Sequence, residues 1–180
     1  MPSSNHKNIF AISGSLRTGS SNHAILRFLA KMAPADVSLT IYDGLATIPP
    51  FDPGNDQEPA PDAVSKFRNL IDQADAVIIC TPEYAYGVPG QLKNALDWTV
   101  SSGSLDNKLM ALITASTGGE NAHAALLLIL GALSANLSKE ATLLIPFIRA
   151  KMDTEGNIID TDTREKLQAI FSALLNELEM

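Results

Sequence analysis

The sequence predicts an α/β fold in which a parallel, doubly wound sheet of five strands is covered by helices on both faces. Three observations support this prediction. Short apolar segments alternate along the chain with longer amphipathic ones, as strands and helices do in such folds. The apolar segment 76–80 (AVIIC) is continuous, which is typical of a strand buried on both faces. Loops rich in glycine, proline and hydroxyl side chains separate the segments.

The first two strands and the helix between them are predicted from the N-terminal quarter of the chain. Residues 7–13 (KNIFAIS) form a short apolar run that ends at a glycine, and a helical pattern follows over 22–31. Residues 37–42 (VSLTIY) alternate as a second strand. The loop at 43–61 is rich in Pro, Gly and Asp, and a loop of this length is more often functional or interfacial than idle.

The middle of the chain repeats the pattern of helix and strand. An amphipathic helix is expected over 63–74, immediately before the buried strand 76–80. A further helix is expected over 91–100, and 108–115 (KLMALITA) forms the fourth strand. The helix predicted at 121–136 is apolar almost all round, so it requires cover on more than one side.

A fifth strand is expected over 141–147, and a helix over 162–179 closes the chain. Thr163 is a candidate to cap this last helix. One face of it is apolar, formed by Leu167, Ile170, Leu174 and Leu175. With 180 residues, 46% of them hydrophobic and 18% charged, residues 1–180 are expected to form a single globular domain.

Charge and composition exclude several classes of function. The formal net charge is -7 and no Lys/Arg cluster is visible, so neither nucleic acid nor an anionic membrane is an expected partner. The longest apolar run, 124–130, is far too short to cross a bilayer. The first residues lack the long apolar core of a signal peptide, so a cytoplasmic location is expected.

Intrinsic metal or disulfide chemistry is also excluded. Cys80 is the only cysteine, so the chain has no internal disulfide, CxxC pair or thiolate cluster. The three histidines, His6, His23 and His123, lack the spacing of metal ligands, and no metal site is expected. Any redox chemistry must therefore come from a bound cofactor.

Three loops are expected to meet at one edge of the sheet. In doubly wound sheets the ligand lies beyond the carboxyl ends of the strands, where the strand order reverses. The loops after strands one, three and four are 14–22 (GSLRTGSSN), 81–91 (TPEYAYGVPGQ) and 116–121 (STGGEN). All three combine glycine with hydroxyl or aromatic residues, as a shaped polar pocket requires.

The first loop has the composition of a phosphate-binding loop. Gly14 and Gly19 permit tight backbone, Arg17 supplies a charge, and the loop opens onto a helix N-terminus, which favours an anion. Further donors are Ser13, Ser15, Thr18, Ser20, Ser21 and Asn22. The loop is not a P-loop, because Ser20 stands where a Lys would, and it lacks the GxGxxG spacing of a dinucleotide turn. The alternative is an ordinary loop with a serine N-cap.

The second loop is suited to a planar heterocycle. Tyr84 and Tyr86 offer flat aromatic surfaces, and Gly87 and Gly90 allow a ring to approach the backbone. The alternative is a hydrophobic loop that simply covers the edge of the sheet.

Taken together, GSLRTGSSN and PEYAYGVPGQLKNALDW resemble the NADPH-dependent FMN reductase family, over essentially the whole chain. The family comprises flavodoxin-like flavoenzymes, among them quinone, azo-dye and chromate reductases. The resemblance implies strand order 2-1-3-4-5, FMN as cofactor, NADPH or NADH as electron donor, and a homodimer or homotetramer. FMN would be bound by Ser13, Ser15, Arg17, Ser20, Ser21, Asn22, Pro82, Glu83, Tyr84, Ala85, Tyr86, Gly87, Ser116, Thr117, Gly118 and Gly119.

The implied activity is hydride transfer from a nicotinamide to FMN, followed by ping-pong transfer to a small acceptor such as a quinone, a free flavin or another xenobiotic oxidant. The flavin carries out the chemistry, so no catalytic side chain is assigned. A different class remains open, namely a flavodoxin-like electron carrier or redox-sensing FMN-binding module without nicotinamide turnover. A third is a nucleotide-binding structural protein that holds no flavin.

Several side chains are expected to have structural roles. Ala85 departs from the family, which usually has Asn there, so the amide side chain is lost near the ring. Glu83 is interpreted as a structural carboxylate of its loop, and the alternative is a general acid or base. Lys93 and Asp97 are interpreted as a surface helix pair. Trp98 is expected to serve in helix packing or a subunit contact. Cys80 is expected to be buried and inert. His123 is expected to cap a helix or face solvent, and the alternative is that it reaches the pocket from beside the loop 116–121.

Overall fold

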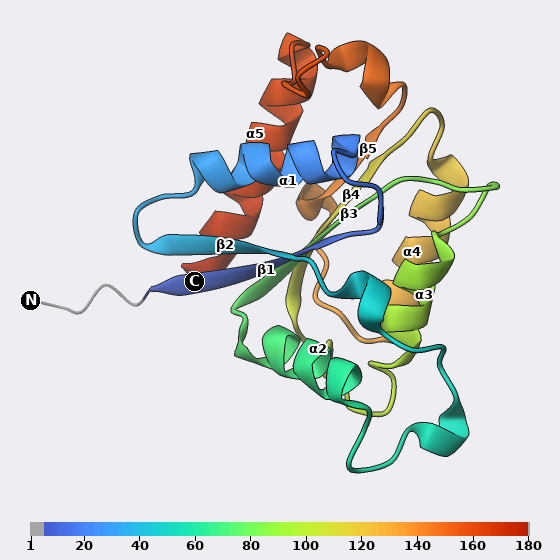
Figure 1. Ribbon diagram of the computed structural model, residues 1–180. Coiled ribbons are helices and arrows are strands. Elements are labelled where there is room, and N and C mark those ends of the chain that lie inside the picture. Colours follow the sequence, from blue (N-terminus) through green and yellow to red (C-terminus); the bar gives the residue numbers. More distant parts are fainter. Residues whose placement is uncertain (1–5, 180) are drawn as a thin grey trace, which may run out of the picture.

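Five parallel strands form one sheet in the order β2-β1-β3-β4-β5 (Figure 1). The structure is a computed structural model, and it describes residues 6–179. The strands are β1 (Lys7–Ser13), β2 (Val37–Tyr42), β3 (Ala76–Thr81), β4 (Leu109–Ala115) and β5 (Thr142–Ile145). The helices are α1 (Ser21–Met32), α2 (Asp62–Gln73), α3 (Gly90–Asp97), α4 (Glu120–Ala132) and α5 (Thr161–Leu178). The predicted fold class and strand order are confirmed.

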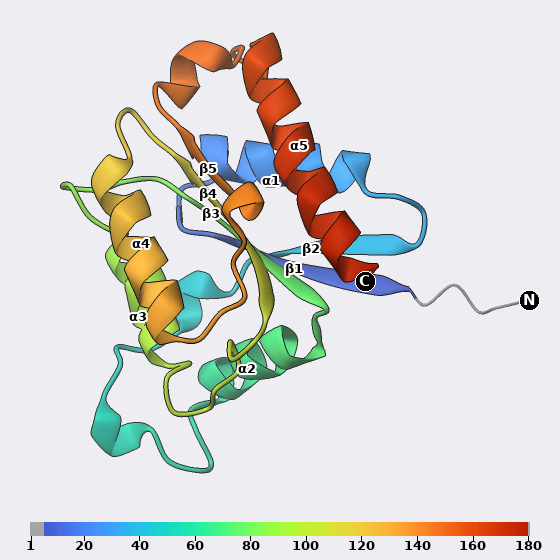
Figure 2. The same cartoon turned by 180° about the vertical axis from the view of Figure 1, so that it is seen from behind.

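The helices form one layer on each face of the sheet (Figures 1 and 2). Because successive residues of a strand point to opposite faces, the six buried residues of β3 contribute to both layers. Val77 and Ile79 pack with residues of α2, α3 and α4, whereas Ile78 and Cys80 pack with residues of α1 and α5. The run 76–80 is therefore continuously apolar because its strand is buried on both faces, as predicted.

The long loop after β2 is held in place by α2 and α3. It contains two short 3-10 helices, η1 (Leu45–Thr47) and η2 (Pro53–Asn55). The indole Nε1 of Trp98 donates to the carbonyl oxygen of Pro49 at 2.9 Å, and the Trp98 ring packs edge-on against Phe51. Trp98 is 1% exposed. Of the two roles predicted for it, helix packing and a subunit contact, the structure therefore supports helix packing.

A buried ion pair secures the same loop further along. The Arg68 guanidinium lies 2.6 Å from the Asp56 carboxylate, and both side chains are less than 10% exposed. Arg68 also donates to the carbonyl oxygen of Trp98 and to Ser101 Oγ. Hydrogen bonds from Ser101 and Arg68 lower the pKa of Asp56. One side chain of α2 thus joins the loop to the segment that follows α3.

The ends of several elements differ from the prediction: α3 ends at Asp97 rather than at Val100, and β5 spans Thr142–Ile145 rather than 141–147. Thr163 does not cap α5, because the cap is Asp160, whose carboxylate accepts from the backbone N–H of Thr163 at 2.9 Å. Two further 3-10 helices, η3 (Lys139–Ala141) and η4 (Ile148–Lys151), flank β5. Helix α4 ends at Ala132 rather than Asn136, since Ser134 adopts a left-handed conformation with φ of 55°. Between residues 6 and 179, no helix combines the length and apolar character needed to cross a bilayer.

Candidate cofactor site

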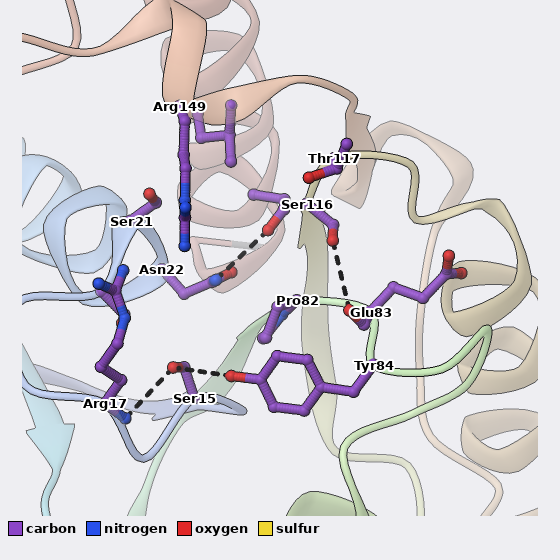
Figure 3. A pocket seen from close by; sticks show the side chains of 13 residues that line it. Ser15, Arg17, Ser21, Asn22, Pro82, Glu83, Tyr84, Ser116, Thr117 and Arg149 are labelled. Carbon is purple, nitrogen blue, oxygen red and sulfur yellow. Dashed lines mark hydrogen bonds between the residues drawn. The ribbon is translucent and has the colours of Figure 1, made fainter.

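A pocket of about 220 Å³ lies at the carboxyl ends of the strands, where the loops after β1, β3, β4 and β5 meet (Figure 3). It is lined by Ser15, Arg17, Ser20, Ser21, Asn22, Pro82, Glu83, Tyr84, Ala115, Ser116, Thr117, Ile148 and Arg149. The three loops singled out from the sequence all contribute, so their predicted meeting at one edge is observed.

The loop after β1 is shaped by close contact with β3. The backbone N–H of Gly14 donates to the Cys80 carbonyl oxygen at 2.9 Å, and a Cβ at Gly14 would collide with the Thr81 side chain. Only glycine therefore fits where the chain leaves β1. Beyond it, Ser15 Oγ accepts from the backbone N–H of Arg17 at 3.3 Å, which curls the loop toward the start of α1.

The first turn of α1 offers donors to the pocket. Ser20 is the N-cap, and its hydroxyl accepts from the backbone N–H of His23 at 3.2 Å. Among residues 6–179, the backbone N–H groups of Ser21 and Asn22 have no acceptor, as is usual for the first residues of a helix. Burial, and secondarily the charge of Arg27, lowers the pKa of His23, which keeps its ring neutral near pH 7. The N-terminus of α1, together with Arg17 of the preceding loop, therefore favours an anion in this pocket.

Asn22 joins the cofactor pocket to the core beneath it. Its side chain is 3% exposed. Its amide Nδ2 donates to the Ala115 carbonyl oxygen at 3.3 Å, and its Oδ1 accepts from the thiol of Cys80 at 3.3 Å. Burial raises the pKa of Cys80, in agreement with the predicted inert core cysteine. The side chain of Asn22 therefore positions α1 against β3 and β4, and its backbone N–H is the group left for a ligand.

The loop after β3 projects as a tight hairpin. Tyr84 and Gly87 exchange two backbone hydrogen bonds of 3.0 Å, and the residues between them, Ala85 and Tyr86, have φ of 49° and 58°. Two left-handed residues in succession define the short hairpin turn that usually contains Asn or Gly. Tyr86 is 83% exposed at the tip, whereas the Tyr84 hydroxyl is hydrogen-bonded to Ser15 Oγ at 3.3 Å. Tyr84 thus forms a wall of the pocket and bridges two loops.

Glu83 secures the start of α4. Its carboxylate accepts from the backbone N–H of Ala122 at 2.8 Å, in the first turn of the helix. The predicted role as a structural carboxylate is confirmed. Gly119, the N-cap, has φ of 125°, and a Cβ there would approach Leu144 to 2.8 Å. The ring of His123 is half-buried, and its Nδ1 is hydrogen-bonded to Thr114 Oγ1 at 2.9 Å. The expectation that His123 caps a helix or faces solvent was therefore wrong.

Arg149 is the principal pocket residue that sequence reasoning missed. It lies on η4, and the chain leading to it is anchored to the loop after β4: Phe147 N–H donates to Thr117 O at 3.2 Å and Ile148 N–H to Ser116 O at 3.1 Å. The guanidinium points into the pocket beside Ser21 (Figure 3). The carboxyl end of β5 lies at the same edge as those of the other strands, so only the strand order, and no motif of the loop itself, indicates that this loop borders the pocket.

Ten of the sixteen predicted cofactor residues line this pocket, and six do not. The six are Ser13, Ala85, Tyr86, Gly87, Gly118 and Gly119. The Ser13 hydroxyl is directed to the backbone of Ser15 and fixes the loop from below. The next three form the exposed hairpin, and the two glycines form the turn that enters α4.

The donors of the pocket suit a phosphate ester. Arg17 and Arg149 converge on it, and neither forms an ion pair with a carboxylate of residues 6–179. Two uncompensated guanidinium groups, a helix N-terminus and serine hydroxyls are the groups that bind phosphate in proteins. A doubly wound sheet with such a site defines the class of α/β proteins that bind a nucleotide-like cofactor.

Comparison with known proteins identifies the family within this class. Residues 8–149 match the family NADPH-dependent FMN reductase, and the chain belongs to that family. It is 36% identical over 172 residues to a quinone reductase from Escherichia coli K12, covering 92% of each chain. It is 32% identical over 171 residues to an NAD(P)H-dependent FMN reductase from Pseudomonas aeruginosa, again covering 92% of each.

The fold comparison agrees with the family. The flavoenzyme FerB from Paracoccus denitrificans, an NAD(P)H:(acceptor) oxidoreductase, superposes with a TM-score of 0.83 at 27% identity, over 96% of this chain and 97% of that one. The chain is therefore a flavin-dependent oxidoreductase, with FMN and NAD(P)H as the cofactors of its family.

Proposed function

We propose that the protein transfers electrons from NADPH or NADH to a quinone or a similar small acceptor, through FMN held in the pocket at the carboxyl edge of the sheet. The observation that carries the proposal is the convergence of Arg17, Arg149 and the free N–H groups of α1 beside the wall formed by Tyr84. Bound FMN supplies the chemistry, because a flavin accepts a hydride from a reduced nicotinamide and passes the electrons on.

The phosphate of FMN is assigned to the α1 end of the pocket. Arg17 and Arg149 approach this end from opposite sides (Figure 3), and Ser15, Ser20 and Ser21 supply hydroxyls around it. Charged hydrogen bonds from guanidinium to phosphate contribute about 1.5–3 kcal/mol each. We assign to these groups the retention of the cofactor rather than its chemistry.

The flavin ring is assigned to the rim beyond Pro82, Glu83 and Tyr84. A pocket of about 220 Å³ is smaller than the roughly 300–1,000 Å³ typical of sites that enclose a whole ligand. It therefore accommodates the phosphate and sugar-like chain and leaves the ring over the rim, between Tyr84 and Thr117. The hairpin residues Ala85, Tyr86 and Gly87, and the turn at Gly118 and Gly119, border that rim in our assignment.

Donor and acceptor are expected to bind in turn. The loops after β1, β3, β4 and β5 line the site, and we assign both substrates to the one face of the flavin ring that these loops leave open. A nicotinamide stacked on this face excludes a quinone from it, because both need contact with the same ring. Ping-pong kinetics follow from this shared face.

A quinone acceptor is supported by the relatives, since the Escherichia coli protein is named a quinone reductase. The test uses the purified protein loaded with FMN. Addition of NADPH or NADH without oxygen is expected to bleach the flavin absorbance within seconds, and a quinone is expected to restore it. Flavin that stays yellow with both nucleotides would instead identify an electron carrier.

Initial rates give a separate test of the shared face. Double-reciprocal plots against NADPH at several quinone concentrations are expected to be parallel. Intersecting lines would require donor and acceptor to be bound together, and they would exclude the shared face while leaving the reductase activity intact.

We propose further that the protein is a homodimer or homotetramer. Helix α4 presents Leu127 and Leu128 to the surface, 41% and 77% exposed, and Tyr86 on the neighbouring hairpin is 83% exposed. Helix α4 and the hairpin lie on the same side of the sheet (Figure 2). Large apolar side chains gathered in this way favour cover by a second copy.

A further inference from the structure

The phosphate end of the cofactor pocket adjoins a second, larger groove, with which it shares lining residues. This groove has a volume of about 470 Å³ and lies between the first turns of α1 and the segment after η4. Arg17, Ser21 and Arg149 line both cavities. A ligand whose phosphate lies between the two arginines therefore has the second groove next to its phosphate.

A third arginine lines only the second of these two cavities. Arg27 lies on α1 almost two turns from its start, and its guanidinium forms no ion pair with a carboxylate of the described residues. Arg17, Arg149 and Arg27 thus supply positive charge from the cofactor pocket into the groove, in a protein of net charge -7. Such a row of guanidinium groups suits two phosphates in succession better than one.

The rest of the groove has groups suited to a nucleoside. Glu155 lines it with an exposed side chain whose Oε2 accepts from Asn157 Nδ2 at 3.5 Å, which leaves Oε1 to accept a hydrogen bond from a ribose hydroxyl. Asp153 lines it too, but its carboxylate is occupied by the backbone N–H groups of Glu155 and Asn157, at 3.0 Å and 2.8 Å. Partly buried Met152 offers the apolar surface that a base requires.

We propose that this groove binds the adenylate half of flavin adenine dinucleotide (FAD), so that the protein takes FAD as well as FMN. The proposal rests on the proposed function, because it places the flavin half in the pocket described above. The pyrophosphate then lies between Arg17 and Arg149 on one side and Arg27 on the other. The adenosine lies along the segment 152–156.

The test measures the binding of FMN and of FAD to flavin-free protein by titration calorimetry at physiological salt. The wild-type protein is expected to bind FAD no more than about threefold more weakly than FMN. Arg27→Gln is expected to weaken FAD about fivefold or more, the loss of one exposed charged hydrogen bond, and to change FMN affinity less than about twofold. The matched control is Lys31→Gln, which removes the same charge one turn along α1 at a residue that does not line the groove.

Two results would overturn the inference: FAD binding more than about threefold weaker than FMN binding in the wild type, or an Arg27→Gln effect that is the same for both flavins. The proposed function fails separately. If FMN itself does not bind, the cofactor assignment is wrong, whereas FMN binding without FAD binding removes only the second groove.

Discussion

Arg17 and Arg149 come from opposite ends of the chain and meet over one phosphate position. Only the first belongs to a recognisable loop motif. Because each guanidinium lacks a carboxylate partner within residues 6–179, its charge is available to a ligand. The two side chains are therefore expected to act as equals in holding FMN.

Arg17→Gln and Arg149→Gln are each expected to weaken FMN binding about tenfold, the loss of one charged hydrogen bond to phosphate. Fluorescence titration of flavin-free protein measures the change. The control is Lys66→Gln, which removes the same charge from an exposed residue of α2. Helix α2 lies on the face of the sheet opposite to α1. An unchanged affinity in Arg149→Gln would place that residue outside the phosphate site.

The position of Ala85 in the hairpin after β3 accounts for a difference between this sequence and its family. The family usually has Asn here, and the structure supplies a backbone reason, because φ at this residue is 49°. Asn adopts left-handed conformations readily, whereas Ala does so at a cost of about 1–2 kcal/mol. The departure from the family therefore concerns the stability of the hairpin as well as the surroundings of the ring.

Ala85→Asn is accordingly expected to raise the free energy of unfolding of the flavin-free protein by about 1 kcal/mol. Urea unfolding followed by circular dichroism measures it. Ala35→Asn serves as control, since Ala35 is also an exposed turn residue but its φ is not positive. Equal effects of the two substitutions would remove the conformational explanation.

At the scale of elements, a buried ion pair is one of the contacts that hold the loop after β2. The pKa of Asp56 lies below its usual range in the folded protein, because Ser101 and Arg68 donate to the carboxylate. The folded state therefore binds a proton at Asp56 less readily than the unfolded chain does. The resulting stabilisation is present above the unfolded pKa of about 3.9 and is lost as the pH falls through the folded pKa.

Asp56→Asn is expected to lower the free energy of unfolding at pH 7 by about 3 kcal/mol, because it leaves the buried Arg68 charge without a carboxylate to balance it. The difference from the wild type is expected to shrink as the pH falls below the unfolded pKa of about 3.9 and through the lowered pKa of the folded state. Urea unfolding across this range measures both effects. The exposed pair Lys166–Asp162 provides the contrast, since Lys166→Gln is expected to cost less than about 0.5 kcal/mol.

The strand order could be predicted from the sequence, whereas the helix ends and one pocket residue could not. The strand order was predictable, because the run 76–80 within β3 is apolar and the loop motifs resemble a family of known topology. Helix ends were not, since Asp160 and Thr163 are both good caps and only the fold selects between them. Arg149 was missed because its position depends on backbone pairing between the loops after β4 and β5, which leaves no local pattern. The cytoplasmic location and the full set of FMN contacts stay predictions.

For the whole molecule, the proposed assembly depends on the exposed leucines of α4. Leu128→Glu places a charge at the most exposed of them and is expected to yield monomers at micromolar concentration in sedimentation velocity, where the wild type sediments as a dimer or tetramer. Leu16→Glu, an exposed leucine of the loop after β1, is the control. A wild-type protein that sediments as a monomer would show that α4 is left uncovered.

The buried thiol of Cys80 beneath the pocket affects how the protein withstands oxidants formed during its own reaction. Reduced flavins can react with oxygen, and the thiolate is the form of cysteine that oxidants attack. Cys80 is the only cysteine of the chain, it is fully buried beneath Asn22, and burial keeps its proton on the sulfur. Peroxide formed at the site would therefore meet neither an accessible thiol nor a thiolate, and repeated turnover in air would leave the sulfur reduced.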